Sequence, residues 1–157
     1  MPFDQLYFSK FYILTPNFMS LIAIIISIIA LLYAGILVVW VLKKPSGSKE
    51  MQEIAKAIQE GAKAYLNRQS MTMAIFAIIL FLVIAFTIPS GDYNNGLLMG
   101  IGFLVGALFS ALAGYIGMGI SVRANVRTTE AAKKGLKEAL AVAFNGGSVT
   151  GMSVVGL

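Results

Sequence analysis

Four stretches of this chain contain no charged side chain, and each is long enough to be considered as a membrane crossing. They are residues 18–42, 71–88, 97–122 and 140–157. A helix needs about 20 apolar residues to cross the hydrocarbon core, and only helices or closed barrels satisfy their backbone groups in lipid. The apolar runs are continuous, whereas barrel strands alternate. The sequence therefore predicts an all-α, polytopic transmembrane helical bundle with three full spans and a fourth cut at the C-terminus.

The composition excludes several kinds of protein. Charged residues make up 12% of the chain and hydrophobic residues 58%, whereas a soluble domain has about 25% charged residues. The chain has no Cys and no His, which removes thiolate and imidazole chemistry. None of the carboxylates lies in an uncharged stretch, although ion pathways need ionisable groups within the membrane. We therefore expect no catalytic, cofactor-binding or metal-ligating residue in this chain.

Lys and Arg side chains indicate how the chain is oriented. They concentrate in segments 43–70 and 123–138, whereas the connection between the second and third spans holds only Asp92 as a charged residue. Positively charged loops stay on the cytoplasmic side. The pattern predicts an integral, multi-pass membrane protein with these two basic segments in the cytoplasm. The N-terminus and the turn around Asp92 would then lie outside.

The chain divides into an N-terminal extension, residues 1–18, and a transmembrane part, residues 19–157. The extension is rich in aromatic residues and could lie in the membrane interface. Alternatively, translation begins at Met19, directly before the first span. Both interpretations stay open at this point.

A cytoplasmic helix is predicted over residues 49–70, with Ser48 as its N-cap. One face of this helix is apolar, and on the other face Lys and Glu alternate. The apolar face consists of Met51, Ile54, Ala55, Ile58, Ala62, Tyr65 and Leu66. No helix breaker precedes Met71, so the helix should continue into the second span. Alternating charge favours a solvated helix packed on its own protein over an arm that binds an anion.

Small residues recur every fourth position in the last two spans. The ladders are Gly102, Gly106, Ser110 and Gly114, and then Ala139, Ala143, Gly147 and Gly151. Small residues let helix backbones approach closely in a bilayer. We expect the ladders to be packing faces, with a substrate groove or ion path as the alternative.

Arg123 and Arg127 are four residues apart and therefore project from the same side of a helix. Two guanidinium groups could hold a phosphate. The simpler expectation is that both side chains extend to the interface as anchors, with Glu130 pairing with Arg127.

Several short segments form an ordered pattern from Met19 onward. They are Lys44–Gly47 with Met51, Ile58–Leu66, Gly114–Met118, Ser121–Arg127, Glu130–Ala132 and Ala143–Val154. In these segments the chain resembles the N-terminal part of the membrane-bound, ion-translocating inorganic pyrophosphatases. The most specific part is Arg-Ala-Asn-Val-Arg, residues 123–127, followed by Gly-Gly-Ser, residues 146–148. Residues 1–18 match no part of the family pattern.

The resemblance implies a large homodimeric enzyme that hydrolyses magnesium pyrophosphate on the cytoplasmic side and moves protons, sodium ions or both outward. It implies Mg²⁺, with K⁺ as a possible second cofactor, and Asp-rich catalytic motifs on helices that follow the region present here. No position in this chain matches those motifs, so no catalytic residue is transferred to it. The first helices would support the inner helices that carry the site.

The implied partners are membrane lipid, the remaining helices of the same enzyme, a second subunit and pyrophosphate as substrate of the complete protein, but not nucleic acid. The chain alone should then be inactive. The alternative function is that of a small, self-contained structural or assembly subunit that packs through its glycine ladders.

Overall fold

The computed structural model describes residues 3–88 and 95–157, with side chains from Phe18 onward, and this part of the chain is helical without strands. The helices are α1 (Phe3–Leu42), α2 (Lys49–Thr87), α3 (Gly96–Ala132) and α4 (Leu136–Gly156). Each contains a stretch long and apolar enough to cross a membrane, and in α1 that stretch is Phe18–Leu42. The all-α, membrane-crossing architecture is confirmed.

Two predictions about the ends of the spans stay predictions. The expected outside turn around Asp92 lies outside the described residues. Helix α1 begins at Phe3, so one helix includes most of the N-terminal extension. A helix is compatible with either interpretation of the extension, and both stay predictions.

The helix predicted over residues 49–70 and the second span form one uninterrupted helix, as the sequence predicted. Ser48 is its N-cap, and the Ser48 hydroxyl accepts a hydrogen bond of 3.4 Å from the Met51 amide. The Gln52 side-chain amide donates to the Gly47 carbonyl at 2.9 Å. Gly47 has φ +80°, a conformation that glycine adopts without steric cost. The start of α2 is therefore determined by local hydrogen bonds and one glycine.

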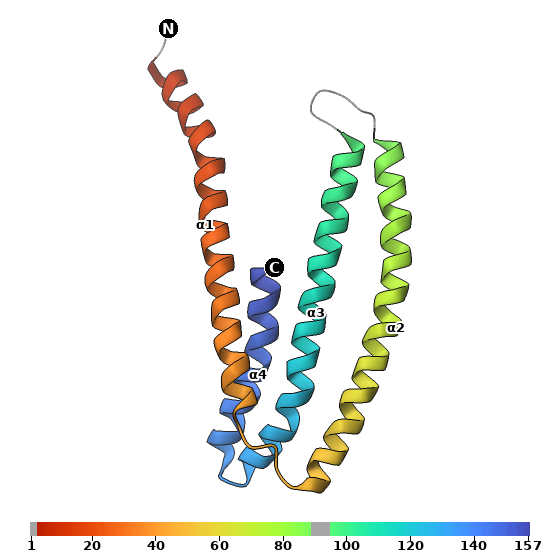
Figure 1. Ribbon diagram of the computed structural model, residues 1–157. Coiled ribbons are helices and arrows are strands. Elements are labelled where there is room, and N and C mark those ends of the chain that lie inside the picture. The colour runs from red at the N-terminus through yellow and green to blue at the C-terminus, as the bar shows by residue number, and fades with distance from the viewer. Residues whose placement is uncertain (1–2, 89–94) are drawn as a thin grey trace.

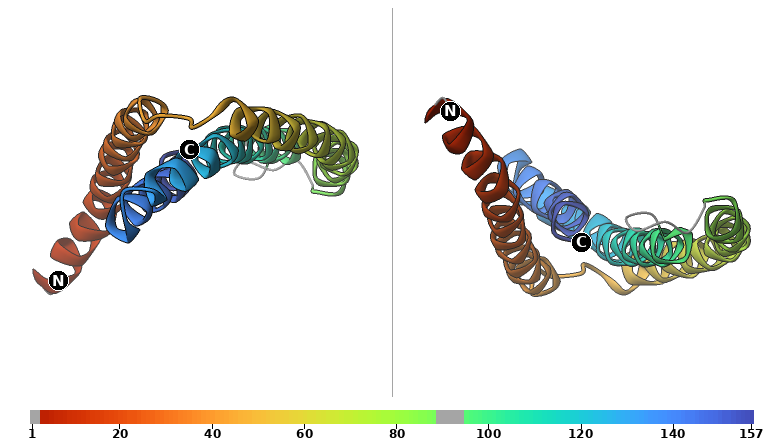
Figure 2. Two further views of the ribbon diagram at one scale, coloured as in Figure 1. Left: turned by 90° about the horizontal axis from the view of Figure 1, so that it is seen from below. Right: turned by 90° about the horizontal axis from the view of Figure 1, so that it is seen from above.

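The helices stand in an open, curved row in the order α2, α3, α4, α1 (Figures 1 and 2). Helix α3 packs against α2 and α4, and α4 packs against α1. In the described part of the chain α1 and α2, although consecutive, do not pack against each other. The consecutive helices α1 and α2 therefore lie at opposite ends of the row.

The tightest packing lies where α1, α3 and α4 meet near the α1–α2 turn. A cluster of buried side chains there comprises Leu37, Val41, Ile120, Ala124 and Val149, and Trp40 packs against it. Most large apolar side chains elsewhere are exposed. Exposed apolar surface on this scale would be unfavourable in water, so it fits a chain surrounded by lipid and by other helices.

The apolar face predicted for the first half of α2 is not covered in the described part of the chain. Ala55 is buried, but Ile54 is 65% exposed and Ile58 48% exposed. Ile54 and Ile58 are therefore not covered within the described residues, and packing of this face on the rest of the protein stays a prediction. The physical reason is the topology, because α2 stands at the end of the row and contacts only α3.

Helices α2 and α3 are linked by one hydrogen bond between side chains. The Tyr115 hydroxyl donates to the Asn67 carbonyl oxygen at 2.6 Å. Tyr115 also lines an apolar groove of about 700 Å³ whose lining includes Met73, Phe76 and Leu104. The lining is mainly apolar, and its other polar residues are Gln69, Ser70 and Ser110.

Replacing Tyr115 with phenylalanine should lower the free energy of unfolding by about 0.6–1.5 kcal/mol, which is typical of a hydrogen bond between membrane helices. The measurement is unfolding of the chain in detergent by SDS titration. Tyr65→Phe is the control, since the Tyr65 ring is 59% exposed and its hydroxyl has no hydrogen-bond partner among the described residues. Equal effects of the two substitutions would contradict a role for the Tyr115–Asn67 bond.

Candidate functional site

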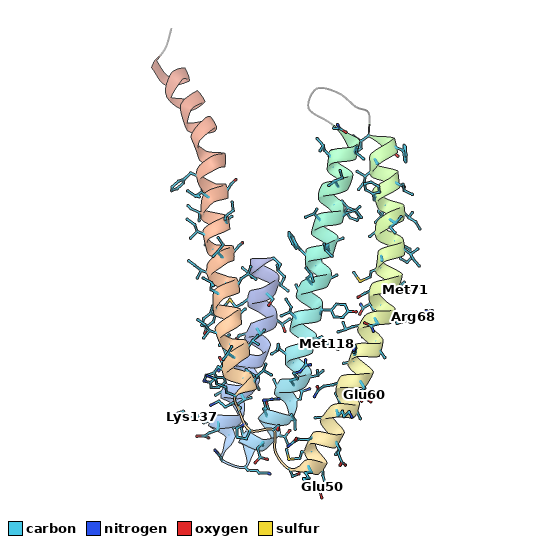
Figure 3. All side chains as sticks on the ribbon, viewed as in Figure 1. Glu50, Glu60, Arg68, Met71, Met118 and Lys137 are labelled. Carbon is cyan, nitrogen blue, oxygen red and sulfur yellow. The ribbon has the colours of Figure 1, made fainter. Side chains whose placement is uncertain are left out.

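Each basic segment includes a turn between two helices, and both turns lie at the same ends of the helices, the lower ends in Figure 1. The turn between α1 and α2 and the turn between α3 and α4 lie side by side there (Figure 1). Glu50 and Lys137, one from each segment, both lie at this end (Figure 3). A shared end is what the charge pattern requires of two loops on one side of a membrane. Which side faces the cytoplasm stays a prediction.

Arg127 links α3 to the end of α1. Its Nε donates to the Lys44 carbonyl at 3.1 Å, and its Nη2 donates to the Leu42 carbonyl at 3.3 Å. The last carbonyls of a helix have no partner within the helix, and they carry partial negative charge. The Arg127 guanidinium therefore caps α1 from a neighbouring helix.

The side chains of Arg123 and Arg127 both bind backbone oxygens of α3. Arg127 Nη1 donates to the Arg123 carbonyl at 2.8 Å, and Arg123 Nη1 donates to the Gly119 carbonyl at 2.7 Å. Both guanidinium groups thus bind backbone oxygens. The expectation that these arginines are anchors rather than a phosphate cradle agrees with these contacts.

The expected ion pair between Glu130 and Arg127 is wrong. Glu130 pairs instead with Lys133, which is three residues further along the same helix. The reason is that Arg127 is already bound to the carbonyls at the end of α1. The Glu130 carboxylate also lies beside the α1–α2 turn, 2.9 Å from where a Cβ atom on Gly47 would stand.

Side chains of α1, α2 and α3 all contact the turn after α1. A Cβ at Gly47 would also lie 2.7 Å from the Met51 side chain. The Lys44 ammonium stands 4.1 Å from the centre of the Trp40 ring, a cation–π contact. The turn links α1, α2 and α3 through short-range contacts.

A polar cleft of about 430 Å³ lies between α3 and α4. It is lined by Ser121, Ala124, Asn125, Thr128, Thr129, Ala143, Gly146 and Gly147. The lining has hydroxyl and amide groups but no charged side chain. Sequence reasoning did not single out this cleft. The cleft residues of α3 and those of α4 each form a short polar or small-residue segment in the sequence. Only the antiparallel packing of α3 on α4 brings the two segments together.

Acidic side chains do not gather into a metal site in the part of the chain that the structure describes. Within residues 18–88 and 95–157, no three Asp, Glu, His or Cys side chains lie close enough to hold a metal ion together. The expectation that this chain carries no catalytic, cofactor-binding or metal-ligating residue stays a prediction.

Among the described residues, the ladder glycines do not form the packing faces, although Ala139 of the second ladder is buried. Nothing lies within 4 Å of the Cβ positions of Gly102, Gly106, Gly114, Gly147 or Gly151. The glycines in close contact are others: Gly117 lies against Thr150, and Gly146 lies against Ala124. Because a helix has 3.6 residues per turn, residues spaced four apart do not stay on one face but move gradually around the helix. The observed α3 contact stripe instead alternates steps of three and four, through Ala113, Gly117, Ile120 and Ala124.

Comparison with known proteins identifies similar sequences. Residues 28–157 match the family model described as inorganic H+ pyrophosphatase. The chain is 49% identical over 130 residues to a K(+)-insensitive pyrophosphate-energized proton pump of Methanosarcina mazei, covering 83% of this chain and 19% of that protein. A pump of the same name from Streptomyces coelicolor is 40% identical over 161 residues, covering 92% of this chain and 20% of that protein. The chain spans about a fifth of the length of these curated relatives.

Proposed function

Because this chain belongs to the inorganic H+ pyrophosphatase family, we propose that it is the N-terminal, mainly structural portion of a membrane pyrophosphatase. The complete protein would couple pyrophosphate hydrolysis on the cytoplasmic side to outward proton transport. The observation that carries this proposal is the family match over residues 28–157. The relatives are named pyrophosphate-energized proton pumps, and this chain spans a fifth of their length.

The distribution of charge supports a structural role for this part. The uncharged stretches of the helices contain no Asp, Glu, Lys or Arg, whereas a proton pathway needs ionisable groups at membrane depth. The proton pathway and the hydrolytic site would therefore lie in the rest of the protein. The contribution of this chain is to hold helices in place, with Arg127 and the Gly47 turn joining α1, α2 and α3.

Magnesium pyrophosphate is the substrate that we propose for the complete protein, which would act as a homodimer. Mg²⁺ prefers carboxylate oxygens as protein ligands. Acidic side chains do not cluster within residues 18–88 and 95–157, so we assign no Mg²⁺ ligand to these residues. The relatives' names include the term K(+)-insensitive, which favours hydrolysis without a K⁺ requirement.

The test is hydrolysis by the complete protein in sealed membrane vesicles. We expect phosphate release from pyrophosphate that requires Mg²⁺, proceeds without K⁺ and moves protons across the membrane. The 157-residue chain alone should release no phosphate. Hydrolysis by this chain alone would contradict the proposed location of the site, and Na⁺ movement without proton movement would contradict proton transport.

A second candidate is a self-contained membrane subunit that assembles through its glycines. It is favoured by the uncovered positions at Gly102, Gly106 and Gly151, where small residues would allow close helix packing. This candidate requires that the purified chain form a defined oligomer in detergent. A monomer in a mild detergent would count against it.

A further inference from the structure

Contacts between the helices determine which residues lie at the same height in the row. Height is measured here from the basic end, the lower ends of the helices in Figure 1, where both basic turns lie. Arg127 of α3 donates to the Leu42 and Lys44 carbonyls at the end of α1. Tyr115 precedes Arg127 by twelve residues of the same helix, so it lies about 18 Å above the end of α1. Asn67 of α2 is at the height of Tyr115, because the two side chains are hydrogen-bonded.

This alignment conflicts with a membrane boundary at Leu42, the end of the first uncharged stretch. With the boundary there, the hydrocarbon core would extend about 30 Å above Leu42. Glu60, Lys63 and Arg68 of α2 would then lie inside it, and Figure 3 places Arg68 well above the end of α1. All three side chains are exposed, and none forms an ion pair within residues 18–88 and 95–157. Because unpaired charges facing lipid are costly, this arrangement favours a boundary nearer to Arg68.

The burial of α1 changes at the same height. From Phe18 onward, its buried side chains all lie near or below the height of Tyr115, and they are Ala30, Ala34, Leu37 and Val41. Above them, residues 18–29 are exposed except for Ser27, which is half-buried. Apolar side chains in water need a buried core, whereas lipid surrounds them without one. The burial pattern therefore fits lipid around the upper part of α1 and a protein core around its lower part.

Three tyrosines lie within about one helical turn of this height. Tyr33 of α1 is 46% exposed, Tyr65 of α2 is 59% exposed and Tyr115 of α3 is 38% exposed. Tyrosine is enriched where lipid meets water, because its ring is apolar and its hydroxyl is polar. Arg68, three residues beyond Tyr65, adds a guanidinium that suits a phosphate headgroup. We call Tyr33, Tyr65, Arg68 and Tyr115 the tyrosine belt.

The length of helix above the tyrosine belt equals one membrane crossing. It comprises residues 68–87 of α2 and residues 96–115 of α3. Each of these segments has twenty residues, or about 30 Å of helix, which is the thickness of the hydrocarbon core. On α1, a segment of the same length that ends at Tyr33 begins at residue 14, inside the helix that starts at Phe3. All three helices are therefore long enough to cross the bilayer above the belt.

We propose that the tyrosine belt contacts the phospholipid headgroups and that the bilayer boundary lies there, above the end of α1. The basic end then projects from the membrane by about 18 Å. The projecting part contains the buried cluster of Leu37, Val41, Ile120, Ala124 and Val149.

Two consequences follow for the projecting part. Arg123 and Arg127 hold the backbone of this part rather than lipid, in keeping with their bonds to carbonyl oxygens. Ile36 is 64% exposed and Val39 53% exposed, so both need cover from other helices of the complete protein. In this one respect the inference rests on the proposed function.

The test measures the depth of two α1 side chains in the complete protein in membrane vesicles. Ile24 is 56% exposed and Leu32 is 65% exposed, and these 157 residues contain no Cys. Ile24→Cys and Leu32→Cys are therefore made singly, with any other Cys of the complete protein replaced, and each is labelled with a nitroxide. Electron paramagnetic resonance then compares collisions with O₂, which concentrates in the bilayer centre, and with a water-soluble nickel chelate. Cover by another helix lowers both collision rates, so their ratio reports depth.

The two boundaries predict opposite results. With the boundary at the tyrosine belt, Ile24 lies near the bilayer centre and Leu32 near the headgroups, so we expect a ratio severalfold higher at position 24. With the boundary at Leu42, Leu32 would lie about 15 Å inside it, at the bilayer centre. A higher ratio at position 32, or equal ratios, would overturn the inference. Pyrophosphate hydrolysis by the unlabelled protein is measured separately, so failure of the proposed function is distinguished from failure of this inference.

A matched pair on α2 gives a second readout. Ala64, just below the tyrosine belt, and Ile75, seven residues beyond Arg68, are both exposed. In vesicles opened to both faces, a membrane-impermeant maleimide should modify Ala64→Cys and leave Ile75→Cys unmodified. A boundary at Leu42 would place both positions in the hydrocarbon core, so protection of both would contradict the belt. Modification of both would contradict a crossing above Arg68.

Discussion

Replacing Arg127 with glutamine should release the end of α1 from α3. The substitution removes the guanidinium that donates to the carbonyls of Leu42 and Lys44. Hydrogen bonds from charged groups contribute about 1.5–3 kcal/mol each when buried. Because this contact is only partly buried, we expect a total loss of about 2–3 kcal/mol of unfolding free energy.

Trp40 allows this effect to be measured directly. It is the only tryptophan in the chain, and it packs on the buried cluster next to the Arg127 contact. Unfolding of the chain in detergent, followed by Trp40 fluorescence, should show a lower midpoint for Arg127→Gln. Loss of packing should also shift the Trp40 emission to longer wavelength before unfolding.

Arg123→Gln is the matched control for this prediction. Arg123 Nη1 binds only the Gly119 carbonyl of its own helix, so its loss should cost less than about 0.5 kcal/mol, as for other surface substitutions. The two variants remove the same charge. Equal destabilisation would therefore show that the effect comes from charge and would contradict a link between α1 and α3.

Replacing Gly146 with leucine should separate α4 from α3. A Cβ at this glycine would stand 2.7 Å from the Ala124 Cβ, and neither atom can rotate away because both are attached directly to a helix backbone. Overpacking of a tight contact costs about 1–3 kcal/mol and occasionally more, and we expect the upper end of this range. The measurement is again the unfolding midpoint in detergent, followed by Trp40 fluorescence.

Gly147→Leu tests whether position rather than residue type causes this effect. Gly147 is the next residue, but nothing lies within 4 Å of its Cβ position, and it lines the polar cleft. In this chain the leucine at 147 should change the midpoint little. A similar loss at both positions would point to a general effect of added bulk on α4 and would contradict a specific Gly146–Ala124 contact.

The helices themselves were largely predictable from local sequence. The uncharged stretch 18–42 ends where α1 ends, at Leu42, and Ser48 occupies the N-cap of α2 as expected. Helix α3 continues to Ala132, ten residues beyond the uncharged stretch that ends at Val122. A helix can continue through charged residues once it has left the membrane. Hydropathy therefore predicts the membrane-spanning part of a helix but not its full length.

The contact faces were not predictable in the same way. Glycine spacing indicated that Gly102, Gly106 and Gly114 would pack, yet the residues buried against α4 include Ala113 and Gly117. Every glycine on a membrane helix allows close approach, and only the position of the neighbouring helix decides which one is used. The partner of Glu130 was not predicted for the same reason, because Arg127 donates its hydrogen bonds to carbonyls at the end of α1.

The sequence by itself therefore determined that this is an all-α membrane chain with its charges outside the spans, since burial of charge and of unpaired backbone groups in lipid is too costly. The tertiary structure decided what each residue contacts. Arg127 caps α1 because α3 lies beside the end of α1, although the residues it contacts are more than eighty positions away. Within the described part of the chain, nothing lies within 4 Å of the Cβ positions of Gly102 and Gly106, although their spacing in the sequence indicated packing.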